Sequence, residues 1–433
     1  MRSYSPVVDT CTPWVACAVA GRPTGAALRR ACRCPWHRAM DRLRATAVPS
    51  LPHSGPSVSA MGSEQARALA TAGEAQVGAT GGLGPAQRVD AALETLFPGY
   101  FAMVMATGIV SIGAQRVGFH QLALALFYLN NVLYAVLWSL LLVRIGRFPR
   151  RILADLGDIN RAPGFLTMVA GTAILGNQYI RLSETKGVAP VLFFAAAALW
   201  LLILYGLLSR MAFGREGRPF EKRVAGSWLL LTVSTQSLAV LAVLAVDQLP
   251  LPTATSLLLA LVMFLLGGFL YLMVILMIFR YFMIGPVTPE SFSPDFWITM
   301  GACAITTLAG SLIVQNVHLD PVLTRLAPFL EGFTLFFWTT GSFWVPLLLV
   351  GGVWRHLLRR LPLAYEPRYW SLVFPLGMYA ASTLELAKAT ALPLTGLAHG
   401  FVYAGLTAWT LTFLGVLLAV ARVLRGTRRG PGT

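Results

Sequence analysis

Apolar runs of about 18 residues or more recur in this 433-residue chain, from about position 98 to the C-terminus. An α-helix of this length crosses the hydrocarbon core of a bilayer. Hydrophobic residues make up 56% of the chain and charged residues only 12%, whereas soluble proteins carry about 25% charged residues. The pattern excludes an ordinary soluble enzyme and predicts an all-α integral membrane protein.

Ten of the apolar segments are long enough to span a bilayer. The segments cover residues 98–116, 121–145, 163–183, 189–211, 226–246, 254–282, 293–315, 326–353, 369–387 and 396–423. The odd-numbered segments begin about 65 to 75 residues apart, so the pattern reads as five helical hairpins that all start on the same side. The repeat predicts ten transmembrane helices arranged as five hairpins in a quasi-fivefold ring around a central pore.

The odd-numbered spans carry small and hydroxylated residues, whereas the even-numbered spans are bulkier. Polar side chains in a membrane face the interior of the bundle or a water-filled path, and Leu or Phe can face lipid. We therefore expect the odd spans to line the pore and the even spans to form a shell. Close packing of helix backbones is the alternative for each small residue. The candidate pore-lining residues are Gly108, Ser111, Gly171, Thr172, Gly176, Ser234, Gln236, Gly301, Thr306, Gly310 and Gly377.

The basic residues between the spans predict the orientation, because cytoplasmic loops are enriched in Lys and Arg. The dense groups follow the second, fourth and eighth spans: Arg144, Arg147, Arg150, Arg151 and Arg161; Arg210, Arg215, Arg218, Lys222 and Arg223; and Arg355, Arg359, Arg360 and Arg368. We therefore expect both termini in the cytoplasm. We expect the protein itself in an inner or plasma membrane. The chain has a net charge of +16. We interpret this charge as basic residues that set the orientation in the lipid bilayer and lie at its surface, and not as a surface that binds nucleic acid.

Phe374 and Pro375 form the most specific local feature of the ninth span. Because Pro375 has no N–H, the carbonyl of Ser371 loses its helical partner and a kink is expected there. A kink in an inner helix would push Phe374 toward the axis, where an aromatic ring would gate permeation. A packed Phe beside a structural kink is the alternative.

Electrostatics predicts small anions as the cargo. All odd helices direct their N-termini, the positive ends of the helix dipole, toward the cytoplasmic mouth, where the arginine-rich loops also lie. Glu385 and Lys388, together with Glu331 and His399, fall near the outer ends of their spans. We expect Glu385 and Lys388 in an outer vestibule or a proton-coupling group, with snorkelling interface residues as the alternative.

An integral-membrane enzyme is the competing class of protein. The six histidines are scattered without the paired spacing of a metal site, and no G-x-S-x-G elbow or acid pair is found. Four of the five cysteines lie within the first 40 residues, without the ligand pairs of a zinc finger. The sequence therefore predicts no catalytic residue, metal or cofactor.

Residues 1–95 are rich in Ala, Gly, Pro, Arg and Ser and show no sustained periodicity. We predict a disordered cytoplasmic segment there, followed by a transmembrane transporter domain over 96–425 and a basic cytoplasmic tail over 426–433. A further hypothesis is that translation starts at Met61, so that the preceding residues are not made. Asp155, Asp158 and Asn160 precede the third span, where helix capping explains them.

Four separated stretches carry a family resemblance. They are residues 97–111 (FPGYFAMVMATGIVS), 300–310 (MGACAITTLAG), 346–356 (PLLLVGGVWRH) and 369–379 (YWSLVFPLGMY). In this order they resemble the tellurite-resistance/C4-dicarboxylate transporter family, which includes the plant slow-type anion channels. The likeness runs from about residue 95 to 425.

The resemblance implies ten helices as five hairpins around a central pore, assembled as a homotrimer. It implies passage of anions such as malate-like C4-dicarboxylates, sulfite, nitrate or chloride. It further implies that Phe374, which precedes Pro375, is the gating residue. An anion channel and a proton-coupled dicarboxylate or sulfite carrier are both compatible with it, since both need the same pore.

Overall fold

The computed structural model describes residues 85–213, 225–284, 288–289, 291–362 and 365–425. Every regular element in these ranges is a helix, which confirms the predicted all-α class. The chain up to residue 84, including the proposed start at Met61, and the basic tail over 426–433 lie outside the described residues.

Each odd-numbered span is a helix that begins with a short 3-10 turn. Four of the turns begin with a Pro or Gly, and the remaining turn has Pro as its second residue. These residues suit the start of a helix, where the first N–H groups have no partner within the helix. The elements are η2 (Pro98–Phe101) with α4 (Ala102–Arg116), η3 (Ala162–Phe165) with α7 (Leu166–Leu182), η5 (Gly226–Leu229) with α9 (Leu230–Leu244), η6 (Pro294–Trp297) with α11 (Ile298–Gln315), and η9 (Pro367–Tyr369) with α13 (Trp370–Thr390).

The even-numbered spans are longer, uninterrupted helices. They are α5 (His120–Arg147), α8 (Val188–Phe213), α10 (Thr253–Ile284), α12 (Pro321–Val353) and α14 (Thr395–Arg425). Shorter elements are α3 (Pro85–Glu94), α6 (Pro149–Gly157), η7 (Val317–Leu319) and a π-helical turn, η8 (Trp354–Leu358).

Seven of the described helices are long and apolar enough to cross a membrane, counting α9 and α11 with their opening turns. Each of the ten predicted spans coincides with a helix, but α4, α7 and α13 fall outside these seven. A multispanning membrane protein is thus confirmed, at seven candidate spans.

Burial separates the odd helices from the even ones. In the most apolar stretch of each helix, 94% of the α9 segment and 100% of the α11 segment are buried, whereas the five even helices range from 11% to 39%. The exposed faces of the even helices carry large apolar side chains, among them Leu202, Phe343 and Leu411. Such faces suit lipid, so the even helices are the outer ones and the odd helices the inner ones.

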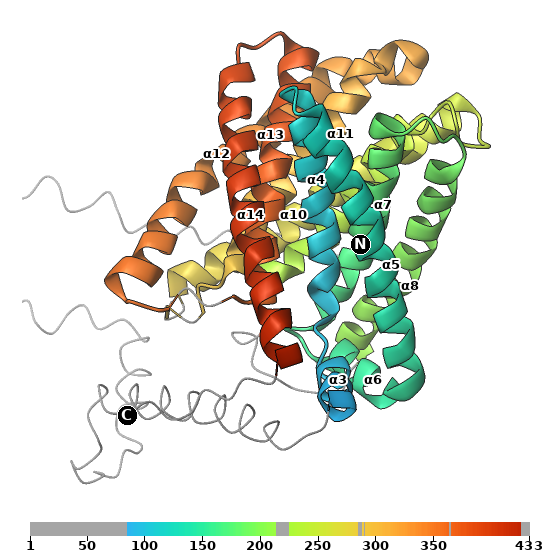
Figure 1. Ribbon diagram of the computed structural model, residues 1–433. Coiled ribbons are helices and arrows are strands. Elements are labelled where there is room, and N and C mark those ends of the chain that lie inside the picture. Colours follow the sequence, from blue (N-terminus) through green and yellow to red (C-terminus); the bar gives the residue numbers. More distant parts are fainter. Residues whose placement is uncertain (1–84, 214–224, 285–287, 290, 363–364, 426–433) are drawn as a thin grey trace, which may run out of the picture. The chain divides into compact units, whose positions relative to one another are not determined.

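Contacts between helices follow one repeated scheme. Each inner helix packs on the outer helix that follows it in the chain, as α13 does with α14 (Figure 1). The inner helices also contact one another in the order α4, α7, α9, α11, α13 and back to α4, and their opening 3-10 turns contact one another in the same order.

An aromatic side chain joins each outer helix to the inner helix of the next hairpin. Four of the five contacts end on a threonine hydroxyl and the fifth on a thiol. They join Tyr134 to Thr172 at 2.9 Å, Trp200 to Thr235 at 2.9 Å, Trp338 to Thr383 at 3.0 Å, Trp409 to Thr107 at 2.9 Å, and Tyr271 to Cys303. The repeated bond fixes one hairpin against the next, since a buried Trp N–H or Tyr O–H needs a partner.

The inner helices share one numbering frame, which starts at the Pro or Gly of each opening turn. These starting residues are Pro98, Pro163, Gly226, Pro294 and Pro367. Four of the partners just described, Thr107, Thr172, Thr235 and Cys303, lie nine residues after the start of their own helix. The chain therefore carries an internal repeat in which equivalent positions can be compared.

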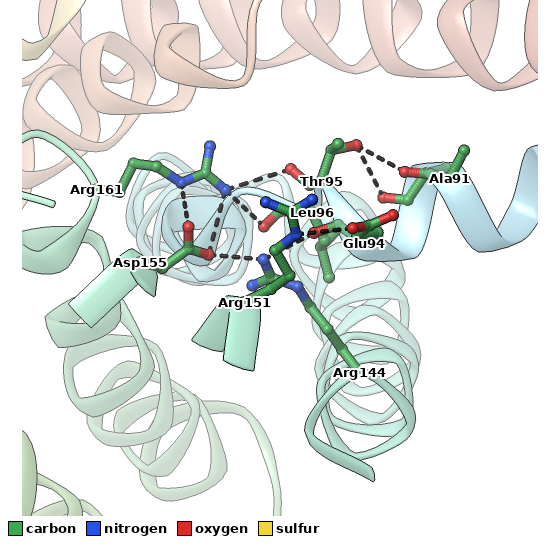
Figure 2. A network of polar contacts seen from close by, with 9 residues as sticks. Ala91, Glu94, Thr95, Leu96, Arg144, Arg151, Asp155 and Arg161 are labelled. Carbon is green, nitrogen blue, oxygen red and sulfur yellow. Dashed lines mark hydrogen bonds and ion pairs between the residues drawn. The ribbon is translucent and has the colours of Figure 1, made fainter. Parts of the chain in front are cut away.

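Asp155 organises a polar network at the N-terminal ends of the inner helices, which is the predicted cytoplasmic side (Figure 2). Its carboxylate accepts hydrogen bonds from Arg144 at 2.6 Å and from Arg161 at 2.7 Å. The two guanidinium groups also donate to the carbonyls of Glu94 and Leu96 at 3.0 and 3.1 Å. The prediction of a capping role for Asp155 is therefore wrong, because its oxygens are taken by arginines; Asp158 accepts the backbone N–H groups instead.

Helix α3 corrects the boundary of the predicted disordered segment, which was placed at residue 95. Residues 85–94 are helical, and Leu93 is buried in the protein. Asp90 and Glu94 form ion pairs with Arg147 at 2.5 Å and Arg151 at 2.7 Å. These contacts with α5 and α6 supply the burial and charge pairing that the composition of this short stretch does not reveal.

Candidate functional site

A cavity lies among the C-terminal halves of the five inner helices. It is narrow and open at its mouth: the space that water can occupy in it is about 20 Å³, close to that of a single water molecule. All five inner helices contribute to its wall: Ile109, Ile112 and Arg116 from α4, Asn177 and Arg181 from α7, Val240 and Leu244 from α9, Ile305 and Leu308 from α11, and Met378, Ala381, Leu384 and Glu385 from α13. Most of this wall is apolar, and its charged groups are Arg116, Arg181 and Glu385.

Equivalent positions of the repeat line the cavity. Ile112, Asn177, Val240, Leu308 and Ala381 each lie fourteen residues after the start of their helix, and all five are in the wall. Wall residues also recur eleven and eighteen residues after the start, as Met378 and Glu385 do in α13. Steps of three and four residues follow one face of an α-helix. The same face of each inner helix is therefore turned toward the shared space.

Glu385 is the centre of the charged cluster and is only 4% exposed. Its Oε1 atom accepts hydrogen bonds from Arg116 Nη2 at 2.5 Å and from Arg181 Nη2 at 3.4 Å. Its Oε2 atom accepts from Gln315 Nε2 at 3.3 Å and from Lys388 Nζ at 3.4 Å. One carboxylate is thus contacted by side chains from four inner helices, α4, α7, α11 and α13.

The cluster keeps an excess of two positive charges, because three cations surround one carboxylate. The side chains of Arg116, Arg181 and Lys388 are 29%, 20% and 48% exposed, so each retains a solvent-facing part. A concave site of one sign concentrates ions of the opposite sign. The mouth of the cavity is therefore electrostatically suited to anions.

Glu385 and Lys388, which are expected in an outer vestibule, contact each other, and Glu385 lines the cavity. Arg116, Arg181 and Gln315 join them but are not among the site residues that the sequence predicts. The repeat carries a usable signal: Arg116, Arg181 and Glu385 all lie eighteen residues after the start of their inner helices. Glu331 is exposed on α12 and His399 is half-buried on α14, and neither lines the cavity.

Five of the six glycines predicted to line the pore lie at helix–helix contacts. A Cβ atom added to any of five of them would meet a neighbouring helix: Gly108 at Ile174, Gly171 at Val104, Gly176 at Leu241, Gly310 at Thr334 and Gly377 at Ile109. None of these five is in the cavity wall. Close packing, the alternative for each small residue, explains these five positions, since glycine in a membrane helix lets backbones approach closely.

The polar residues predicted to line the pore bond to backbone or to outer helices. Ser111 donates to the carbonyl of Ala123, and Gln236 donates to that of Phe264. Thr172, Ser234 and Thr306 donate to carbonyls in their own helices. These five side chains also lie outside the cavity wall.

Phe374 lies one helical turn before Met378 on the face of α13 that lines the cavity. It is 2% exposed, and α13 continues as one helix past Pro375. The equivalent positions of the other inner helices, seven residues after their starts, hold Met105, Ala170, Val233 and Gly301. These equivalent residues form one layer of the bundle, and Phe374 is the only aromatic side chain in it. Gly301 is the one predicted lining residue that lies on the face of its helix that is turned toward the cavity.

Among the described residues, no group of three or more His, Cys, Asp or Glu side chains is arranged to hold a metal ion.

Comparison with known proteins identifies a family of membrane channels. The SLAC1 family model, described as voltage-dependent anion channel, matches residues 95–417. An uncharacterized membrane protein of Mycobacterium tuberculosis is 35% identical over 159 residues, which are 36% of this chain and 79% of that protein. An uncharacterized transporter of Methanocaldococcus jannaschii is 22% identical over 295 residues, which are 66% of this chain and 82% of that protein. The family match includes every residue of the cavity wall.

Proposed function

This chain belongs to the voltage-dependent anion channel family, and from that premise we propose that it carries small anions along a path between its five inner helices. The relatives of Methanocaldococcus jannaschii that are named as transporters support a transport role over an enzymatic one. The observation that carries the proposal is the cavity, because all five inner helices share it and its mouth holds an excess of positive charge.

The proposed architecture is a quasi-fivefold ring of ten transmembrane helices around this path. The cyclic contacts of the inner helices support it, as do the repeated aromatic bonds between hairpins. The buried positions of α4, α7 and α13 explain why these helices are less apolar than a lipid-facing span. Lipid does not solvate them, so their polar groups need only protein partners.

Phe374 is the proposed gate of the path. It lies one turn below the cavity, in a layer where the other four inner helices place Met, Ala, Val and Gly. A single large ring in a layer of mostly small side chains has room to fill a narrow opening, and hydrophobic constrictions block ions by excluding water. Pro375 packs on Gly301 and so fixes the helix directly beside the ring.

The proposed cargo is a small anion of the kinds that the family resemblance implies: malate-like C4-dicarboxylates, sulfite, nitrate or chloride. A proton-coupled dicarboxylate or sulfite carrier is the second candidate, because it would need the same path and the cavity wall carries one carboxylate, Glu385. Collapsing the pH gradient separates the two, since carriage would stop and channel flux would continue.

We further propose an inner or plasma membrane location, with both termini in the cytoplasm, and assembly as a homotrimer. The basic groups beside α5, α6 and α12 support this orientation. The apolar faces of the outer helices are compatible with both lipid and neighbouring subunits. Labelling of single cysteines from either side tests the orientation, and crosslinking in native membranes tests the trimer.

Purified protein in proteoliposomes tests the transport function directly. Uptake of chloride, nitrate, sulfite and malate is measured in parallel against protein-free liposomes, with a potassium flux assay as the control for leakage. We expect uptake of at least one anion without potassium flux. Anion uptake equal to that of protein-free liposomes for all four anions would remove the proposed function.

A further inference from the structure

We propose that Arg116 and Arg181 form an anion-binding site at the mouth of the cavity, and that Glu385 occupies this site as a tethered competitor for the transported anion. The inference rests on the proposed transport function and assigns its binding site. The ligand class is a small oxyanion or carboxylate.

The ion pairs around Glu385 define the site. Arg116 and Arg181 come from different inner helices, yet their Nη2 atoms both reach the same oxygen, Oε1 of Glu385. Charge-assisted hydrogen bonds of this kind are stronger than neutral ones, and the planar guanidinium matches the geometry of carboxylates. The two arginines are therefore already arranged around a carboxylate oxygen, which is the chemistry of an incoming anion.

The second oxygen of Glu385 has partners of its own, which remain when an incoming anion replaces Glu385 at the two arginines. Oε2 accepts hydrogen bonds from Gln315 and Lys388, whereas both arginines donate to Oε1. When an anion takes the Nη2 donors of Arg116 and Arg181, Glu385 keeps the partners of Oε2. The buried carboxylate is thus never left without a charged partner, which limits the cost of the exchange.

The cavity wall offers the anion a second polar contact and no competing charge besides Glu385. Asn177 lies one turn before Arg181 on α7, is 5% exposed and lines the cavity. Of the two polar atoms of its amide, only Nδ2 could serve an anion, because the nitrogen donates hydrogen bonds whereas the oxygen only accepts them. The remaining wall is apolar, and low polarity strengthens the attraction between an anion and the arginines.

The charge balance predicts which change strengthens binding. Removing the charge of Glu385 leaves Arg116 and Arg181 in the cavity wall with no internal competitor. Glu385→Gln keeps the size of the side chain and its hydrogen bonds to Gln315, and we expect it to lower the apparent Kd for anions roughly tenfold, more for malate than for nitrate. Arg116→Gln and Arg181→Gln should each raise the apparent Kd roughly tenfold, because each removes one charge-assisted hydrogen bond.

Binding is measured separately from transport. Thermal unfolding of the detergent-purified protein is followed against rising nitrate, chloride and malate at constant ionic strength, since a ligand of the folded state raises the Tm with its concentration. The apparent KM of uptake in proteoliposomes is the second readout. Glu331→Gln is the matched control, because it removes one carboxylate that is exposed on α12 and outside the cavity, and we expect no shift in either measurement.

The outcomes separate this inference from the transport function. Unchanged anion affinity in Glu385→Gln and in both arginine variants, in protein that still takes up anions, would overturn the site. A lack of uptake by the wild type would remove the transport function, while the shifts in Tm would still decide the binding site. If Glu385→Gln does not fold, Glu385→Asp keeps the charge but shortens its reach toward the arginines, and a lower Kd is again expected.

Discussion

Pro375 in α13 packs directly against Gly301 in α11: a Cβ atom on Gly301 would lie 2.7 Å from Cγ of the proline ring. Gly301 belongs to the layer that contains Phe374, and Pro375 follows Phe374 directly, so this contact between the two inner helices lies next to the proposed gate. Glycine at 301 is what allows this approach, because any side chain there would need the space that the proline ring fills.

Gly301→Ala is therefore expected to destabilise the protein by about 1–3 kcal/mol, the usual cost of overpacking a filled interior. Gly352→Ala is the matched control, since Gly352 is also helical and a Cβ atom added to it would meet no atom within 4 Å. There the better helix propensity of alanine should leave stability unchanged or slightly raised. Thermal unfolding in one detergent compares the two, and equal Tm values would contradict the contact.

Phe374→Ala is expected to raise the anion current, because it removes the only aromatic ring from its layer of the inner helices. Recordings in planar bilayers or oocytes measure the effect. Phe337→Ala is the control: Phe337 is equally buried but packs edge-on against Tyr271 between outer helices. That variant should lose stability without gaining current. An unchanged current in Phe374→Ala would refute the gate.

Asp155→Asn is expected to lower the free energy of unfolding by about 2–4 kcal/mol, because it leaves the guanidinium of Arg144 buried without a charged partner. The side chain of Arg144 is only 1% exposed. The control is Asp90→Asn, whose pair with Arg147 is exposed on both sides and should contribute less than about 1 kcal/mol. Equal effects in a chemical unfolding experiment would show that burial of the network does not matter.

Trp409→Phe is expected to cost about 1 kcal/mol through the lost hydrogen bond to Thr107, in addition to the smaller ring. A double-mutant cycle with Thr107→Val isolates the bond, because the two substitutions should be less than additive when they remove the same interaction. The same cycle at Trp200 and Thr235 should give a similar coupling energy, since that pair occupies the equivalent position in the repeat. Strict additivity at both places would contradict the proposed equivalence of the hairpins.

The candidate site shows what the assignment of helices from the sequence can predict and what it cannot. Hydropathy located all ten segments, and the small residues correctly marked the buried helices. Yet Gly108, Gly176 and Gly310 face neighbouring helices, and the cavity wall is built mostly from Ile, Val and Leu. Small residues report burial, and a buried helix has several faces; composition does not distinguish the face that packs from the face that meets the cavity.

The sequence by itself determined which segments form the long helices and which of these helices are the most buried. Each membrane helix satisfies its own backbone hydrogen bonds, so length and hydropathy are local properties that can be read one segment at a time. Only the tertiary structure decided how each inner helix is rotated, because rotation depends on side chains that interlock across helices. That rotation brings Arg116 and Arg181, from helices far from α13 in the chain, to the single carboxylate of Glu385.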